Sequence, residues 1–271
     1  MGSSRPADAW DPAAYLRFAG ERARPFLDLV ARVDVTAPGT VVDLGCGDGS
    51  TTALLADRWP TARVTGIDSS AEMLAAAPRR PRLDFRLGDV RDWQPQEPVD
   101  VLVCNAVLHW VPGHDRLLAR WAQQLAPGGV LAVQVPGNFR APTHALLHGL
   151  CRSPSWSERL ADVAPSPSAV LEPAGYLDVL TGAGLAADVW ETTYLHVLSG
   201  EDPVLGWVRS TVLRPVLARL DETAAAAFTA EYAAGLRTAY PRRPDGSTLL
   251  PFRRVFAVGA RAGGRPRGVR R

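Results

Sequence analysis

The sequence has few cysteines and no long hydrophobic run. Its three cysteines, Cys46, Cys104 and Cys151, form no Cys-x-x-Cys pair, and their number is odd. This pattern argues against a disulfide framework and against a cysteine-based zinc site. No apolar run approaches the ~20 residues of a membrane-spanning helix, and residues 1–10 lack the apolar core of a secretory signal. We therefore expect a cytoplasmic protein that has no membrane partner.

Lysine is absent, so arginine supplies all 30 basic residues. We attribute this to codon bias, because alanine, proline and glycine are abundant. The 28 acidic residues leave a formal net charge of only +2 at pH 7. Residues 262–271 form a basic tail with few apolar residues to bury, which predicts disorder. Because no aromatic residues are interleaved with these arginines, we expect no nucleic-acid partner.

The length and composition predict one large domain. Hydrophobic residues make up 46% of the chain and charged residues 21%, which is ordinary for a globular protein. A chain of 271 residues is long enough for a full hydrophobic core. We expect a single domain over residues 1–261, followed by the tail.

Three closely spaced glycines follow the first predicted strand. In residues 40–52, an apolar run containing Asp43 leads into Gly45, Gly47 and Gly49, and a helical pattern follows. Glycines permit unusual backbone angles and let a ligand lie directly on the chain. The exposed N–H groups at the start of a helix favour an anionic group. This stretch predicts a site for a nucleoside that carries a polar group.

The spacing of the glycines argues against a dinucleotide cofactor. Dinucleotide-binding turns have the spacing Gly-x-Gly-x-x-Gly, whereas here the third glycine comes one residue earlier. The negative charge of Asp43 would also oppose a pyrophosphate, and it suits a ligand that bears a cation. A sulfonium or ammonium ligand is therefore favoured over NAD, and an NAD-dependent oxidoreductase is disfavoured.

Alternating strand and helix patterns predict a parallel sheet with helices on both faces. Right-handed crossovers place the carboxyl ends of the first and fourth strands side by side, and we expect the ligand there. Helical patterns cover residues 51–59, 71–76, 140–152, 176–181, 202–219 and 221–239. The predicted strands are 41–44, 63–67, 83–87, 99–104, 130–135, 187–197 and 249–258, with residues 125–129 as the turn into the fifth strand.

Residues 42–49 resemble motif I of the class I S-adenosylmethionine-dependent methyltransferases. Further stretches resemble the trans-aconitate 2-methyltransferase family, and the similarity runs from about residue 10 to about residue 261. These stretches are 15–18, 21–25, 66–70, 92–95, 142–144 and 213–215. The resemblance implies a Rossmann-like fold with a mostly parallel seven-stranded sheet and a helical substrate cap. The cap elements would be residues 10–30, 140–173 and 199–247. Within the first of these, Asp11 and Pro12 predict the start of a helix.

The resemblance also implies S-adenosylmethionine as cofactor. Asp68 lies 19 residues after Gly49, about where an acid in this topology accepts both ribose hydroxyls; the alternative is a helix N-cap. Asp89 matches the position that contacts the adenine amine, and Val90 would offer a backbone N–H to the ring. Asn105 would border the methionyl part. The predicted cofactor-binding residues are Asp43, Gly45, Gly47, Asp68, Asp89, Val90 and Asn105.

The implied reaction is methyl transfer to a carboxylate oxygen of trans-aconitate, which yields the monomethyl ester and S-adenosylhomocysteine. A carboxylate is already ionised at pH 7, so no acid or base is required and positioning carries the rate. Arginines suit a tricarboxylate because their planar fork binds carboxylates through two hydrogen bonds. The predicted substrate-binding residues shared with the family are Arg22, His144, Tyr176, Tyr194, Arg214 and Arg254; Tyr15 and Arg209 are further candidates.

Other interpretations of the site are a different acceptor and a binding protein without turnover. The acceptor could be a carboxyl group on an acyl carrier, or a phenol or quinone. A phenol has a pKa near 10 and would need a base, for which His109 or His144 would be candidates. His144 and His148 are four residues apart on a predicted helix, but no third ligand accompanies them, so we expect no metal site.

Overall fold

The computed structural model describes residues 19–163, 170–209 and 211–263. The predicted helix start at Asp11 and Pro12 and the candidate Tyr15 lie outside the described residues, as do residues 264–271 of the tail. Within the described ranges, no helix combines the length and apolar character that a membrane span requires.

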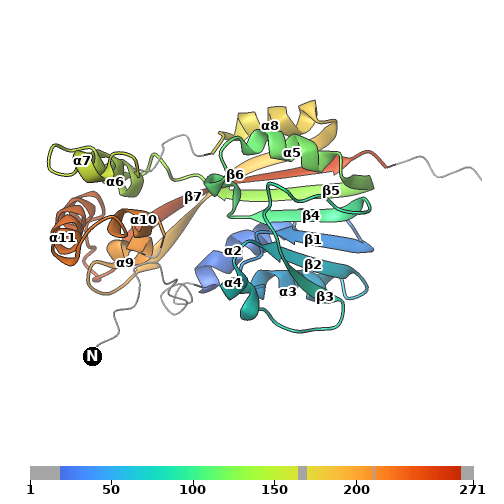
Figure 1. Cartoon of the computed structure of the whole chain (residues 1–271), viewed down its shortest axis with the longest axis horizontal. Coiled ribbons are helices and arrows are strands. Elements are labelled where there is room, and N and C mark those ends of the chain that lie inside the picture. Colours follow the sequence, from blue (N-terminus) through green and yellow to red (C-terminus); the bar gives the residue numbers. More distant parts are fainter. Residues whose placement is uncertain (1–18, 164–169, 210, 264–271) are drawn as a thin grey trace, which may run out of the picture. The chain divides into compact units, whose positions relative to one another are not determined.

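Seven strands form one sheet. They are β1 (Thr40–Leu44), β2 (Arg63–Asp68), β3 (Leu83–Leu87), β4 (Val99–Asn105), β5 (Leu125–Pro136), β6 (Leu185–Leu198) and β7 (Thr248–Arg261). Their spatial order is β3-β2-β1-β4-β5-β7-β6 (Figure 1). Along the spatial order β3-β2-β1-β4-β5, each strand is parallel to the next. The following strand, β7, is antiparallel to β5. The predicted mostly parallel seven-stranded sheet is confirmed.

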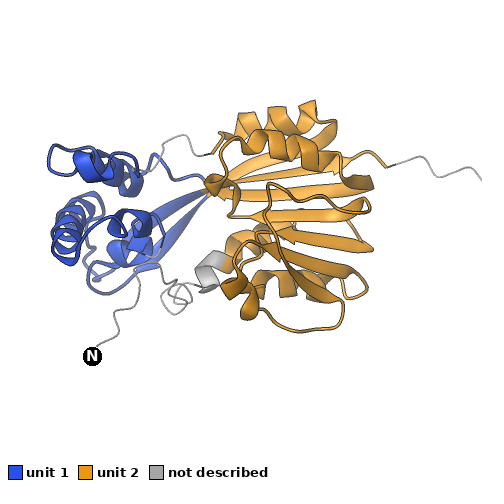
Figure 2. Ribbon diagram, viewed as in Figure 1, with its two compact units in different colours: residues 1–22, 137–169, 193–253 blue, residues 23–136, 170–192, 254–271 orange. Residues whose placement is uncertain are grey.

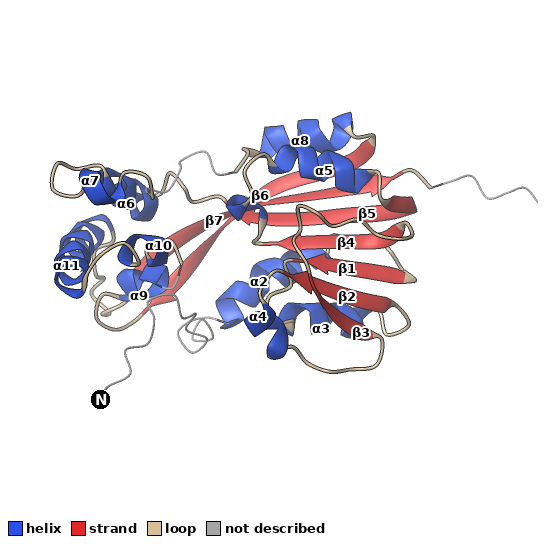
Figure 3. Cartoon of the chain, in the orientation of Figure 1, coloured by secondary structure: helices blue, strands red, loops and turns tan. Residues whose placement is uncertain are grey.

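Helices pack against both faces of the parallel strands (Figure 3). Leu102 and Cys104 of β4 belong to a buried cluster that also contains Leu118 and Tyr176, from the helices α5 and α8. The alternate residues of the strands face α3, whose Thr52 is hydrogen-bonded to Asp43 of β1. The helices of this part are α2 (Ala19–Val30), α3 (Ser50–Arg58), α4 (Ala71–Ala75), η1 (Leu108–Trp110), α5 (His114–Ala122) and α8 (Pro173–Gly182).

The chain divides into two compact units (Figure 2). Unit 2 comprises residues 23–136, 170–192 and 254–271, and unit 1 comprises residues 1–22, 137–169 and 193–253. The helices of unit 1 are α6 (Pro142–Cys151), α7 (Ser157–Leu160), α9 (Pro203–Arg209), α10 (Arg214–Leu217) and α11 (Glu222–Ala239), which share a core of their own. Most of the predicted cap ranges 140–173 and 199–247 belong to unit 1; that they cover a substrate stays a prediction.

Two local predictions differ from the structure. Residues 125–129, predicted as a turn, form the start of β5, where Leu125 pairs with Val99 before the register shifts. Gly129 permits this close approach, since a Cβ there would lie 2.9 Å from the carbonyl oxygen of Val99. The predicted helix 202–219 is divided into α9 and α10, because Pro215 lacks a backbone N–H and lies in the first turn of a new helix.

The turn between β1 and α3 depends on its glycines. Gly45, Gly47 and Gly49 have φ angles of +76°, +58° and +73°, which side chains with a Cβ rarely adopt. There is also no space for a side chain at two of these positions. A Cβ at Gly45 would lie 2.1 Å from Cγ2 of Val107, and one at Gly49 would lie 2.4 Å from the ring of Phe85. The backbone of the turn is therefore held close to β3 and to the segment after β4.

We expect Gly45→Ala to lower the free energy of unfolding by about 2–5 kcal/mol, because left-handed strain and overpacking add together. Gly149→Ala in α6 is the matched control. No atom lies within 4 Å of its added Cβ, so it should raise stability by up to about 1 kcal/mol through helix propensity. Denaturant unfolding of both variants measures the difference. Equal stability of Gly45→Ala and the wild type would contradict the tight turn.

Candidate active site

Asp68 terminates β2 beside the glycine turn. Its Oδ2 accepts the backbone N–H of Gly47 at 2.8 Å, and its Oδ1 accepts that of Ser70 at 2.9 Å. Each carboxylate oxygen therefore retains an acceptor position. Ser70 itself caps α4, since its Oγ accepts the N–H of Met73. The alternative role of Asp68, as the N-cap of α4, is thus taken by Ser70. Contact of Asp68 with the two ribose hydroxyls stays a prediction.

Asp43 lies beneath the turn with only 2% of its surface exposed. Burial raises the pKa of its carboxyl group to about 6, and the nearby charge of Asp68 acts in the same direction. The hydroxyl of Thr52 donates a 2.7 Å hydrogen bond to Oδ2 and opposes this increase. At neutral pH the site thus holds a buried negative charge, which suits a ligand with a positive group.

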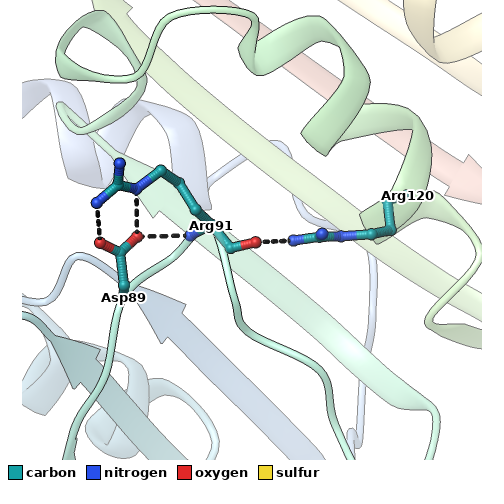
Figure 4. Close-up of polar contacts among 3 residues, drawn as sticks. All are labelled: Asp89, Arg91 and Arg120. Carbon is teal, nitrogen blue, oxygen red and sulfur yellow. Dashed lines mark hydrogen bonds and ion pairs between the residues drawn. The ribbon is translucent and has the colours of Figure 1, made fainter.

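Asp89 is held by the residue two positions further along the chain (Figure 4). Its Oδ1 accepts the backbone N–H of Arg91 at 2.8 Å and Nε at 2.9 Å, and its Oδ2 accepts Nη2 at 2.6 Å. These bonds lower the pKa of Asp89 to about 2. Arg120 of α5 donates to the carbonyl oxygen of Arg91. Oδ2 retains an acceptor position, so the adenine contact predicted for Asp89 and for the buried Val90 stays open.

The end of β4 carries an unpartnered polar atom and an unusual backbone angle. Within the described residues, the buried Oδ1 of Asn105 has no hydrogen-bond partner. Ala106 has a φ of +57°, and its N–H donates to the carbonyl oxygen of Gln134 at 2.8 Å. Such backbone strain costs about 1–3 kcal/mol and is concentrated at functional sites. These features agree with a ligand position next to Asn105.

Tyr176 is buried in the hydrophobic core rather than at an open surface. Its side chain is 1% exposed, and its hydroxyl lies 3.0 Å from Nε2 of His114, whose ring stacks on it. Burial raises the pKa of Tyr176 and keeps the hydroxyl protonated. This environment gives Tyr176 a structural partner, so its substrate role stays a prediction that the geometry does not favour.

The predicted residues of unit 1 have different environments. His144 is 8% exposed, and its Nδ1 lies 3.1 Å from Oγ1 of Thr143. Burial lowers the pKa of His144 to about 4, so its imidazole is neutral at pH 7. Tyr194 is buried and stacks on His196. Arg214 and Arg209 are exposed, at the start of α10 and the end of α9.

Arg254 lies in unit 2, near the start of the part of β7 that pairs with β5. It is 6% exposed, and its Nη1 donates to Oε1 of Gln134 at 3.2 Å. Arg22 lies in α2, but its side chain is outside the described part. Asp43, Asn105 and Arg254 thus belong to unit 2, whereas His144, Tyr194 and Arg214 belong to unit 1.

Sequence reasoning missed two polar residues of this site. Gln134 interrupts an otherwise apolar run from Val130 to Pro136, and that interruption was the available signal. Arg91 follows Asp89 by two positions, a spacing that carries no signal by itself. The structure places no three His, Cys, Asp or Glu side chains of the described ranges where they could hold a metal ion.

Asp43 should make stability dependent on pH. The pKa of its carboxyl group rises from 3.8 to about 6 in the folded state, so the folded state favours the protonated form. The resulting stabilisation is present below pH 3.8 and is lost as the pH rises through about 6. It amounts to about 3 kcal/mol, at about 1.4 kcal/mol for each pKa unit.

Asp43→Asn removes this titration. Between pH 4 and 7 the wild type should therefore lose about 2.4 kcal/mol of stability relative to Asp43→Asn, before any ligand is added, because part of the total is lost below pH 4. Urea unfolding of both proteins across this range is the measurement. A stability difference that stays constant with pH would show that Asp43 keeps an ordinary pKa.

Comparisons with known proteins agree with this geometry. Residues 41–129 match the family model of a methyltransferase domain. The chain is 56% identical over 259 residues to the trans-aconitate 2-methyltransferase of Streptomyces avermitilis, covering 92% of this chain and 96% of that protein. It is 48% identical over 260 residues to the trans-aconitate 2-methyltransferase of Mycobacterium tuberculosis, covering 96% of this chain and 99% of that protein.

Solved structures show the same fold at much lower identity. The YcgJ protein of Bacillus subtilis is 14% identical with a TM-score of 0.56, covering 89% of this chain and 99% of that one. The phosphoethanolamine N-methyltransferase 2 of Haemonchus contortus, solved with S-adenosylhomocysteine, is 15% identical with a TM-score of 0.51, covering 88% of this chain and 52% of that one. The predicted Rossmann-like methyltransferase fold is confirmed. Together with the long, highly identical matches, this shows that the chain belongs to the trans-aconitate 2-methyltransferase family.

Proposed function

We propose that this enzyme transfers a methyl group from S-adenosylmethionine to a carboxylate oxygen of trans-aconitate. The products are the monomethyl ester and S-adenosylhomocysteine. The observation that carries the proposal is the 56% identity, over 92% of the chain, to a protein named for this reaction. The partner is thus a small polycarboxylate. The cytoplasmic location predicted from the cysteine pattern stays a prediction.

The residues of unit 2 fit the cofactor. Asp68 retains an acceptor position on each oxygen for the two ribose hydroxyls. Asp89 and Val90 would hold the adenine. The unpartnered Oδ1 of Asn105 and the buried carboxylate of Asp43 suit the methionyl end, which carries an ammonium and is adjacent to the sulfonium. When bound, S-adenosylmethionine supplies a methyl group on a positively charged sulfur.

The chain's contribution to the reaction is binding and orientation rather than proton transfer. A carboxylate with a pKa near 4 is ionised at neutral pH, so no side chain needs to remove a proton from it. His144 is neutral there, and with a pKa of about 4 it is a poor base for a phenol. Arg254 provides a permanent, buried positive charge for a carboxylate. The other proposed substrate contacts are Arg22, His144, Tyr176, Tyr194 and Arg214.

The reaction is tested with purified protein, S-adenosylmethionine and a panel of di- and tricarboxylic acids, by mass spectrometry of the products. We expect the methyl ester of trans-aconitate to form fastest. At saturating S-adenosylmethionine the rate should be constant from pH 7.5 to 8.5, because the acceptor carboxylates and Asp43, whose pKa is about 6, are ionised throughout this range. Methylation of a phenol or of an acyl-carrier carboxyl group, with no ester from any small acid, would replace the proposed acceptor.

We expect Asp68→Asn to weaken the binding of S-adenosylhomocysteine by about hundredfold, because a hydrogen bond to a charged acceptor contributes about 1.5–3 kcal/mol. Asp100→Asn is the matched control. Asp100 also accepts two backbone N–H groups, from Gly39 and Thr40, but at the opposite end of the parallel strands. Calorimetry should show unchanged affinity for Asp100→Asn. Unchanged affinity for Asp68→Asn would remove the ribose assignment.

A further inference from the structure

Four polar residues lie in a row across one face of the sheet in unit 2. Asp43 of β1 pairs with Val103 of β4, and Asn105 lies two residues further along the same face. Asn105 pairs with Gln134 of β5. Arg254 of β7 pairs with the residue two positions after Gln134, so it shares that face as well. The strands are neighbours in the order β1, β4, β5 and β7 (Figure 1).

Gln134 is the member of this row that has no assigned role. It is 0% exposed, and its Oε1 accepts a hydrogen bond from Nη1 of Arg254 at 3.2 Å. This bond fixes the orientation of the amide. Within the described residues, the buried Nε2 of Gln134 has no partner. Because a buried donor without an acceptor is destabilising, the amide points to an acceptor that comes from a ligand.

The charges along the row indicate which chemical group this ligand presents. The row begins with the carboxylate of Asp43 and the unpartnered acceptor Oδ1 of Asn105. It ends with the unpartnered donor of Gln134 and the guanidinium of Arg254. The first two residues suit a cationic group and the last two an anionic group. A carboxylate is complementary to an amide N–H next to a guanidinium.

We propose that Gln134 binds a carboxylate of the acceptor through Nε2 and positions Arg254 for the same carboxylate through Oε1. This inference rests on the proposed function, and it adds a substrate-binding residue to it. The amide contributes a hydrogen bond without a second positive charge. Neutral donors form weaker bonds than charged ones, so the bound carboxylate is neutralised less than it would be by two cations.

Gln134→Glu separates the two roles of this side chain. Glutamate has nearly the same shape and still accepts a hydrogen bond from Arg254, but it has no donor and repels a carboxylate. We expect the affinity of trans-aconitate for the protein loaded with S-adenosylhomocysteine to fall by about tenfold to hundredfold, the range of a lost hydrogen bond to a charged group. The KM for trans-aconitate should rise in parallel. The affinity for S-adenosylhomocysteine alone should stay within about twofold of the wild type, since that ligand is placed at the other end of the row.

Gln123→Glu is the matched control, because the Nε2 of this exposed glutamine donates to the carbonyl oxygen of Ala183. It should leave both affinities unchanged. Gln134→Met, which removes the donor and the acceptor at similar volume, provides a second variant. Its binding of trans-aconitate should also fall, because the donor and the acceptor for Arg254 are both lost, with circular dichroism as the check on folding.

The results that overturn the inference differ from those that overturn the proposed function. If Gln134→Glu weakens S-adenosylhomocysteine and leaves trans-aconitate unchanged, the donor serves the cofactor. If Gln134→Glu binds both ligands like the wild type, the amide has only a structural role. In both cases the wild type still forms the ester. If the wild type binds S-adenosylhomocysteine but neither binds nor methylates any polycarboxylate, the proposed function itself is wrong, and the carboxylate role of Gln134 is wrong with it.

Discussion

The buried carboxylate of Asp43 is the constraint on which the rest of the site depends. A charge with 2% exposure needs compensation, and among the described residues Thr52 of α3 donates a direct hydrogen bond to it. That bond ties the first strand to the first helix after it, across the glycine turn. That bond lowers the pKa of the carboxyl group by less than burial raises it, so its compensation of the buried charge is partial. A cationic group above the turn would complete it, which links the local chemistry of β1 to the choice of cofactor.

The sequence predicted the features whose signals are local. Strand patterns, the glycine spacing and the acids at strand ends can each be recognised within a few residues, and parallel topology then places their carboxyl ends at one edge. The start of β5 was predicted wrongly because Pro127 and two glycines indicate a turn, whereas pairing with β4 extends the strand through a bulge. The division between α9 and α10 follows from Pro215, a signal that is present in the sequence within the helical pattern of residues 202–219.

Residues whose roles depend on register could not be identified in this way. A role for Gln134 can be recognised only from the register of β5 with β4 and β7, because that register places it between Asn105 and Arg254. Tyr176 depends on tertiary structure in another way. A tyrosine in a stretch that resembles the family suggested a substrate contact, which stays a prediction; the structure adds that its buried hydroxyl is hydrogen-bonded to His114. Side-chain direction on a helix is decided by tertiary packing, which similarity of short stretches does not report.

The polar row explains how one face of a sheet can serve a reaction between a cation and an anion. A sulfonium and a carboxylate attract each other, so the protein does not need to create the attraction; it needs to fix the distance and direction between them. Opposite charges at the two ends of the row, with neutral amides between, accomplish this without neutralising either reactant at the centre. Two cations beside the carboxylate would neutralise more of its charge and make it a weaker nucleophile. Their tighter binding would not compensate, because binding that is equal or stronger in the ground state does not accelerate the chemical step. The amide of Gln134 between Asn105 and Arg254 is therefore better suited to methyl transfer than a further arginine, in a chain that has many arginines.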